Sequence, residues 1–179
     1  MMRATIMAAT MLGGCVHTPP RALALPQDRF MDRLQALCGK AFAGRLVTSD
    51  AADADMAGAA MVMHVRSCSP SEVRVPFHVR RKDGSWDRSR TWIVTRTSTG
   101  LRLKHDHRHE DGSEDVRTQY GGDTATPGTA TRQEFPVDQY SKDLFVQLNT
   151  PLSLTNVWAM DVEPGQRFAY EVRRLNRLA

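Results

Sequence analysis

Three histidines at alternate positions, His105, His107 and His109, are the residues whose types and spacing most directly suggest chemistry. Neutral imidazoles bind zinc and similar metals, and alternate side chains of a β-strand point to one face about 7 Å apart. Two of the three can therefore share one ion, while a third ligand, His64 or His78, must come from another strand. This spacing raises the hypothesis of a histidine-based, metal-dependent enzyme with His105, His107 and His64 as metal ligands.

Neighbouring charges and the absence of catalytic motifs argue against an enzyme. Arg88 and Arg90 are expected on the same face as the histidines, and a metal ion gains nothing from guanidinium neighbours. His107 and Asp106 are adjacent on a strand, so their side chains face opposite ways. No G-x-S-x-G elbow, H-E-x-x-H motif or glycine-rich phosphate loop occurs, and no cofactor is expected. The remaining acid–base candidates pair His105 or His107 with a distant carboxylate: Glu134, Asp161 or Glu171.

A long β-hairpin over residues 86–112 is expected to position these side chains. Residues 90–97 and 101–109 alternate β-branched or aromatic side chains with polar ones, which is typical of strands with one covered face. Gly100 closes the turn between them. A four-residue turn gathers the apolar side chains on one face, and the hydrophobic pattern usually fixes register. The expected pairs are Arg96–Leu101, Val94–Leu103, Trp92–His105, Arg90–His107 and Arg88–His109.

The inner face of this hairpin is apolar near the turn and cationic at the far end, which suits an amphiphilic or anionic ligand. Trp158 and the valine- and methionine-rich strands would complete an apolar cavity. Histidines gain charge as the pH falls through about 6.5, so acidification is expected to strengthen binding. The alternative is a structural or interaction protein without a ligand. The predicted ligand-binding residues are Arg88, Arg90, Trp92, His105, His107 and His109.

The remaining chain indicates a single β-rich domain over residues 27–179. Residues 27–38 have the apolar spacing of a helix that ends before Gly39, and short strands joined by turns follow without βαβ alternation. This pattern predicts a mostly β fold, an antiparallel meander or a lipocalin-like up-and-down barrel, with one N-terminal helix. Besides the hairpin, strands are expected at 40–48, 60–68, 73–79, 116–120, 132–137, 153–162 and 167–174, a short helix at 141–148 and a flap-like loop at 121–130.

Residues 1–14 have the features of a signal peptide, with Arg3 before a short apolar run. The ending Leu12-Gly13-Gly14-Cys15 resembles the lipobox of bacterial lipoproteins, which implies cleavage before Cys15 and a lipid on its sulfur. Residues 15–26 contain three prolines and are expected to form a tether. By the same resemblance, Val16 favours the outer membrane, facing the periplasm. The alternative is an ordinary signal peptide.

The cysteines and the charge fit an envelope protein with small-molecule partners. Cys38 and Cys68 form an even pair, and a disulfide between them would close a loop of about 30 residues and stabilise the fold by roughly 3–4 kcal/mol. Two free buried thiols are the alternative. The net charge of +4 is spread along the chain and does not indicate a nucleic-acid partner. The expected partners are a small amphiphilic or anionic molecule and, through the lipid anchor, a membrane.

Three motifs resemble a family of uncharacterised secreted bacterial proteins: Arg-Ser-Arg-Thr-Trp at 88–92, Lys-His-Asp-His-Arg-His-Glu-Asp-Gly at 104–112 and Thr-Asn-Val-Trp-Ala-Met at 155–160. The resemblance covers residues 30–173 and implies secretion without implying an activity. Gly39, Phe42 and Gly44 are weakly similar to the start of lipocalin-like barrels, which implies a barrel.

Overall fold

The structure is a computed structural model that describes residues 25–49 and 51–174. Its helices are α1 (Pro26–Gln35) and α2 (Gln139–Gln147), with 3-10 helices η1 (Ala51–Met56) and η2 (Pro151–Thr155). Its strands are β1 (Ala41–Gly44), β2 (Met61–His64), β3 (Ser67–Cys68), β4 (Glu72–Arg80), β5 (Trp86–Arg96), β6 (Leu101–His107), β7 (Tyr120–Asp123), β8 (Arg132–Pro136), β9 (Asn156–Glu163) and β10 (Arg167–Arg174).

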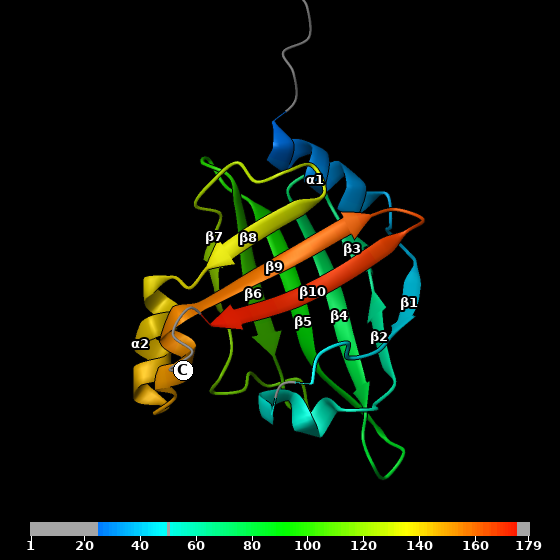
Figure 1. Cartoon of the computed structure of the whole chain (residues 1–179), viewed down its shortest axis with the longest axis vertical. Coiled ribbons are helices and arrows are strands. Elements are labelled where there is room, and N and C mark those ends of the chain that lie inside the picture. The colour runs from blue at the N-terminus through cyan, green and yellow to red at the C-terminus, as the bar shows by residue number, and fades with distance from the viewer. Residues whose placement is uncertain (1–24, 50, 175–179) are drawn as a thin grey trace, which may run out of the picture.

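Two antiparallel sheets form the fold, and the smaller one crosses in front of the larger one (Figure 1). The larger sheet has the order β1-β2-β4-β5-β6-β7, with β3 also paired to β4, and the smaller has the order β10-β9-β8. Strands that follow one another in the chain are mostly neighbours in the sheets. The expectation of a mostly β, antiparallel meander with an N-terminal helix is therefore confirmed.

The closed barrel, the other expectation for this fold, is not found in the described part of the chain. Closure requires that every strand pair with two neighbours. Among residues 25–49 and 51–174, β1 pairs only with β2 and β10 pairs only with β9. The sheets consequently pack as two open layers.

The β5–β6 hairpin has the register expected from its hydrophobic pattern. The pairs Arg96–Leu101, Val94–Leu103, Trp92–His105 and Arg90–His107 all form, and the amide of Thr97 donates to the carbonyl of Gly100 at 2.9 Å. The expected pair Arg88–His109 does not form, because β6 ends at His107. The four-residue turn is confirmed.

Helix α1 covers the end of the sheets that carries this hairpin turn. Phe30, Met31 and Leu34 are fully buried in the core. Asp28 forms an ion pair with Arg96, next to the turn. Shortly after α1, Gly39 adopts a left-handed backbone with φ of 80°, as a helix-terminating glycine often does. The expected disulfide joins Cys38 to Cys68, with a Cα–Cα distance of 6.3 Å, and so ties this end to β3.

Several elements differ from the sequence expectation near glycine and proline. The expected strand at 116–120 and part of the loop at 121–130 are replaced by β7, in which Gly121 and Gly122 are buried. A Cβ at Gly122 would lie 1.7 Å from the carbonyl oxygen of Pro136, so glycine is needed for this close approach. Helix α2 begins earlier than expected, because Asp138 and not Ser141 provides its N-cap.

Pro76 lies within β4, although proline in a sheet is usually confined to an edge strand or a bulge. β4 is internal: β5 pairs with one side, and β2 and β3 share the other. The β2 pairs stop at Phe77 and the β3 pairs stop at Arg74, so Pro76, which lacks an N–H, falls between them. The register of the β4–β5 ladder shifts just beyond this proline, between Phe77 and Val79.

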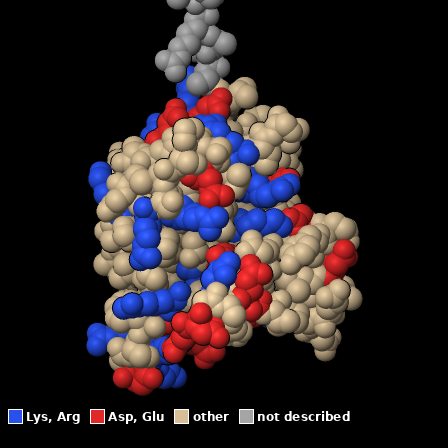
Figure 2. Space-filling view, turned by 180° about the vertical axis from the view of Figure 1, so that it is seen from behind, with Lys and Arg blue, Asp and Glu red and all other residues tan. Residues whose placement is uncertain are grey.

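The outer face of the larger sheet carries basic and acidic side chains side by side (Figure 2). Arg102 forms an ion pair with Asp123 at 2.6 Å, and Lys104 forms one with Asp138. The segments expected to form a signal peptide and a tether, including Cys15, lie almost entirely outside the described residues. The helices within residues 25–49 and 51–174 are too short or too polar to span a bilayer.

Candidate functional site

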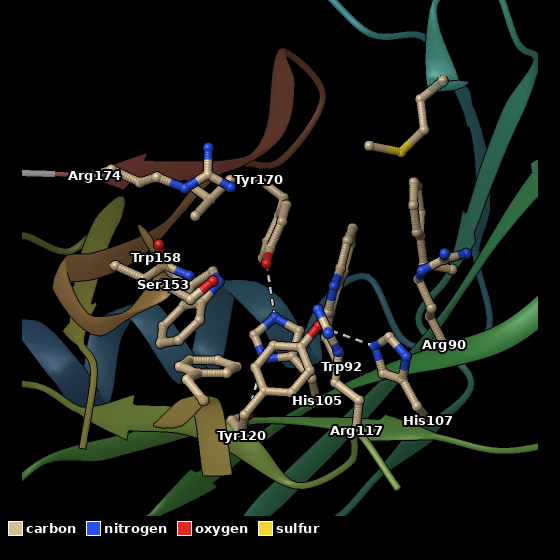
Figure 3. Close-up of a pocket in the computed structure, with 15 residues that line it drawn as sticks. Arg90, Trp92, His105, His107, Arg117, Tyr120, Ser153, Trp158, Tyr170 and Arg174 are labelled. Atoms are coloured by element: carbon tan, nitrogen blue, oxygen red, sulfur yellow. Dashed lines mark hydrogen bonds between the residues drawn. The ribbon is translucent and has the colours of Figure 1, made fainter. Parts of the chain in front are cut away.

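A cavity of about 230 Å³ lies between the two sheets, toward the end of the hairpin that is remote from its turn (Figure 3). Both sheets, η1, η2, α2 and the loop before β7 contribute to its wall. The lining residues are Met56, Phe77, Arg90, Trp92, His105, His107, Arg117, Tyr120, Phe145, Ser153, Asn156, Trp158, Tyr170, Val172 and Arg174.

Four of the six predicted ligand-binding residues line this cavity, namely Arg90, Trp92, His105 and His107. The hairpin register explains this grouping, because Arg90 and Trp92 pair directly with His107 and His105. Arg88 and His109 are exposed and do not line the cavity. The ladder ends before them, and the imidazole of His109 lies 4.0 Å from Asp115.

Trp92 forms part of an aromatic stack that closes the inner end of the cavity. Its ring centroid lies 4.7 Å from that of Phe77 and 4.3 Å from that of Tyr170, with nearly parallel planes. Trp92 is only 4% exposed. Because Trp92 stacks against these rings and is almost fully buried, it forms a fixed part of the wall.

His105 is held by a hydrogen bond at each ring nitrogen. Nδ1 lies 3.0 Å from the carbonyl oxygen of Tyr120, which can only accept, so Nδ1 carries the proton. Nε2 therefore accepts from the hydroxyl of Tyr170 at 2.6 Å. Burial lowers the pKa of His105 to about 3 and raises the pKa of Tyr170 well above its usual value. The pair is thus neutral, and neither imidazole nitrogen is free to bind a metal.

His107 is also uncharged at neutral pH. Its Nε2 lies 3.0 Å from the hydroxyl of Tyr120. Burial, followed by the positive charge of Arg90, lowers the pKa of His107 to about 4, and burial raises the pKa of Tyr120 to about 12. The expectation that His107 titrates near 6.5 is therefore wrong, because the reference value applies to a solvated imidazole.

The cavity wall holds three arginines and, among the described residues, no aspartate or glutamate. Arg90 is paired with Asp87 at 2.5 Å. Burial opposes ionisation of Asp87, but hydrogen bonds from Ser89 and Arg90 outweigh it and lower its pKa to about 2. Within residues 25–49 and 51–174, the side chains of Arg117 and Arg174 form no ion pair. The lining is therefore electropositive.

Two buried polar atoms in this wall have no partner in the described structure: Oδ1 of Asn156 and Nε of Arg174. The two residues face each other in the β9–β10 ladder. A buried polar atom without a hydrogen bond costs about 1–3 kcal/mol. Such atoms are rare in native proteins and often mark an ion, water or ligand that completes them.

Trp158 was expected to complete the cavity and does line it, but sequence reasoning missed the other lining residues that come from outside the hairpin. Tyr170, Val172 and Arg174 alternate along β10, and Asn156 and Trp158 alternate along β9, so the period of two was visible in both. What the period did not reveal is that these faces pack against the hairpin. That contact depends on how two separate sheets meet.

Metal and acid–base chemistry receive no geometric support. No three His, Cys, Asp or Glu side chains within the described ranges are grouped to hold a metal ion. His64 does not line the cavity, and its Nδ1 accepts from Arg66 at 3.3 Å. The candidate carboxylates Glu134, Asp161 and Glu171 instead surround Arg132 on the outer face of the smaller sheet, at 2.5–3.0 Å.

No protein-family model, curated protein or solved structure matches this chain. The resemblance to a secreted bacterial family stays a hypothesis. The function must accordingly be argued from the geometry and charge of the cavity.

Proposed function

We propose that this protein is a binding module of the bacterial envelope that holds a small anionic molecule in the cavity between its two sheets. The observation that carries the proposal is the composition of the cavity wall: three arginines, aromatic side chains and, within the described residues, no carboxylate. Guanidinium groups bind carboxylate and phosphate oxygens with charge-assisted hydrogen bonds. Aromatic walls favour an apolar portion in the same ligand.

The size of the cavity narrows the choice of ligand. Its volume of about 230 Å³ lies below the ~300–1,000 Å³ typical of sites for drug-sized ligands. A compact anion, or the head group of an amphiphile whose tail stays outside, fits such a space. The sequence predicted an amphiphilic or anionic ligand, and this volume favours a small anion over a whole lipid.

Binding is favoured over catalysis by the hydrogen bonds in the wall. A general base works best when its pKa lies near the operating pH, whereas His105 has a pKa of about 3 and His107 one of about 4. Tyr170 keeps its proton because burial raises its pKa. These side chains therefore supply a rigid, neutral surface with fixed donors and acceptors.

Calorimetric titration with small carboxylates and organic phosphates tests this proposal. Arg90→Ala should weaken binding by roughly 1.5–3 kcal/mol, the range for a hydrogen bond to a charged group. Arg102→Ala is the matched control, because Arg102 lies on the outer face and pairs with Asp123. Equal losses in both variants would contradict a site at this cavity. If no small anion binds the unsubstituted protein, the structural or interaction alternative is favoured.

A further inference from the structure

The charge balance of the cavity defines the ligand further, provided that the proposed binding function holds. Asp87 neutralises Arg90, and the hydrogen bonds of His105 leave its ring neutral. Arg117 and Arg174 remain without a carboxylate partner within residues 25–49 and 51–174. The carboxylate of Asp115 accepts a hydrogen bond from the backbone N–H of Arg117 at 2.7 Å. The wall thus carries an excess of two guanidinium charges.

These two arginines approach the cavity from different parts of the fold. Arg117 lies in the segment between β6 and β7, beside the larger sheet, whereas Arg174 ends β10 in the smaller sheet. Figure 3 shows Arg174 on one side of the cavity, and Arg117 and Arg90 on others. A group bound between Arg117 and Arg174 would therefore contact both layers.

The unpartnered buried atoms lie at the Arg174 side. Nε of Arg174 is buried and donates to no acceptor in the described structure. Oδ1 of Asn156, its partner in the ladder, is also unpartnered, but this oxygen is an acceptor and does not contribute to binding of an anion. The terminal N–H groups of a planar guanidinium can donate to two oxygens of one carboxylate or phosphate group.

We infer that the ligand is a small dianion, either a phosphate monoester or a dicarboxylate, clamped between Arg117 and Arg174. Two singly charged guanidinium groups balance two negative charges. A monoanion would balance only one of the two guanidinium charges. The site accordingly discriminates between ligands of similar shape by their charge.

Two pairs of probes test this inference by calorimetry at pH 7.5. Phenyl phosphate and benzenesulfonate are similar in shape, but the phosphate is a dianion above its second pKa of about 6. Succinate and butyrate form the corresponding carboxylate pair. In the pair whose chemistry fits the site, the dianion should bind at least about tenfold more tightly than the monoanion. A factor of ten requires about 1.4 kcal/mol, and a hydrogen bond to a charged group contributes more than that. Comparing the pairs separates phosphates from dicarboxylates.

Arg117→Gln and Arg174→Gln should each remove the advantage of the dianion, while Arg102→Gln keeps it. Equal affinity for dianion and monoanion would overturn the dianion inference and leave the binding function intact. No binding by any of the four probes would overturn both. Retention of the advantage in Arg117→Gln and Arg174→Gln would overturn the clamp. Arg117 is exposed, so Arg117→Gln decides the matter if Arg174→Gln does not fold.

Discussion

His105 holds the cavity wall rigid, and its protonation state links the stability of the fold to pH. Its two hydrogen bonds connect β6, the start of β7 and β10, so one imidazole joins both sheets. A protonated ring could not accept from Tyr170, and its charge would be buried without a counter-ion. The neutral form is therefore part of the folded state.

This residue makes the fold sensitive to acid. The pKa of His105 is about 3 in the folded protein and about 6.5 when unfolded, so below pH 6.5 the unfolded chain binds a proton that the native chain does not. The free energy of unfolding should fall by up to about 1.4 kcal/mol per pH unit from this group, between about pH 6 and 3. Urea unfolding from pH 7 to 4.5 measures the slope.

His105→Gln should reduce this slope, because glutamine keeps one donor and one acceptor but does not titrate. His109→Gln is the matched control, since His109 is exposed and does not line the cavity. An unchanged slope in His105→Gln would show that other groups cause the acid sensitivity.

Binding should be insensitive to pH over the range in which a solvated histidine titrates. The pKa of His107 is about 4, because the ring is buried beside Arg90, although Asp115, Asp87 and Asp106 act in the opposite direction. Affinity for benzenesulfonate, which stays a monoanion, should therefore be constant between about pH 8 and 5. Titrations across that range, with the His107 ring followed by NMR, check this; a rise in affinity near pH 6.5 would contradict it.

At the scale of elements, strands with a strict period of two were predictable, whereas close backbone approaches were not. The β5–β6 register followed from the alternation of Val94, Trp92 and Leu103 with polar residues, because one face is buried. In contrast, the Gly121-Gly122 pair looked like a loop. These glycines lie in a strand whose neighbours, Pro136 and Leu103, come so close that no side chain would fit there. Such a contact depends on chain segments far apart in sequence.

Gly122→Ala tests this account of β7. A Cβ there would lie 1.7 Å from the carbonyl oxygen of Pro136, and backbone atoms cannot move away cheaply, so we expect a loss of at least about 1–3 kcal/mol of stability. Gly44→Ala in β1 is the control, because a Cβ at Gly44 meets nothing within 4 Å, and its effect should stay within about 0.5 kcal/mol. Thermal unfolding of both variants gives the comparison. Similar melting temperatures would contradict the close approach.

At the scale of the whole molecule, the site is formed by two sheets. Sequence patterns reveal which side chains share a face within one sheet, but not how the two sheets pack. The hairpin contributes Arg90, Trp92, His105 and His107, all of which were predicted. The opposing wall, with Asn156 and Arg174, required knowledge of how the layers pack. The choice between a meander and a closed barrel stayed open for the same reason, since a period of two occurs equally in barrels and in layered sheets.

Attachment to a membrane is a property of the whole chain that the N-terminal motif predicts. Cys15→Ser should release the protein into the soluble periplasmic fraction, because it removes the sulfur that would carry the lipid. Fractionation of cells that express either form, with detection of the folded domain, makes the measurement. A soluble distribution of the unsubstituted protein would contradict lipidation.

The open layering of the two sheets also bears on how this protein can diversify. Between the described strands of opposite sheets no ladder of backbone hydrogen bonds forms, so the width of the cavity is set by side chains. Substitutions at peripheral lining positions such as Ser153 and Val172 can reshape its volume while the register of every strand is preserved. Ligand specificity can therefore change among related sequences without a change of fold. Sequence differences at these lining positions would then reflect different ligands and not different architectures.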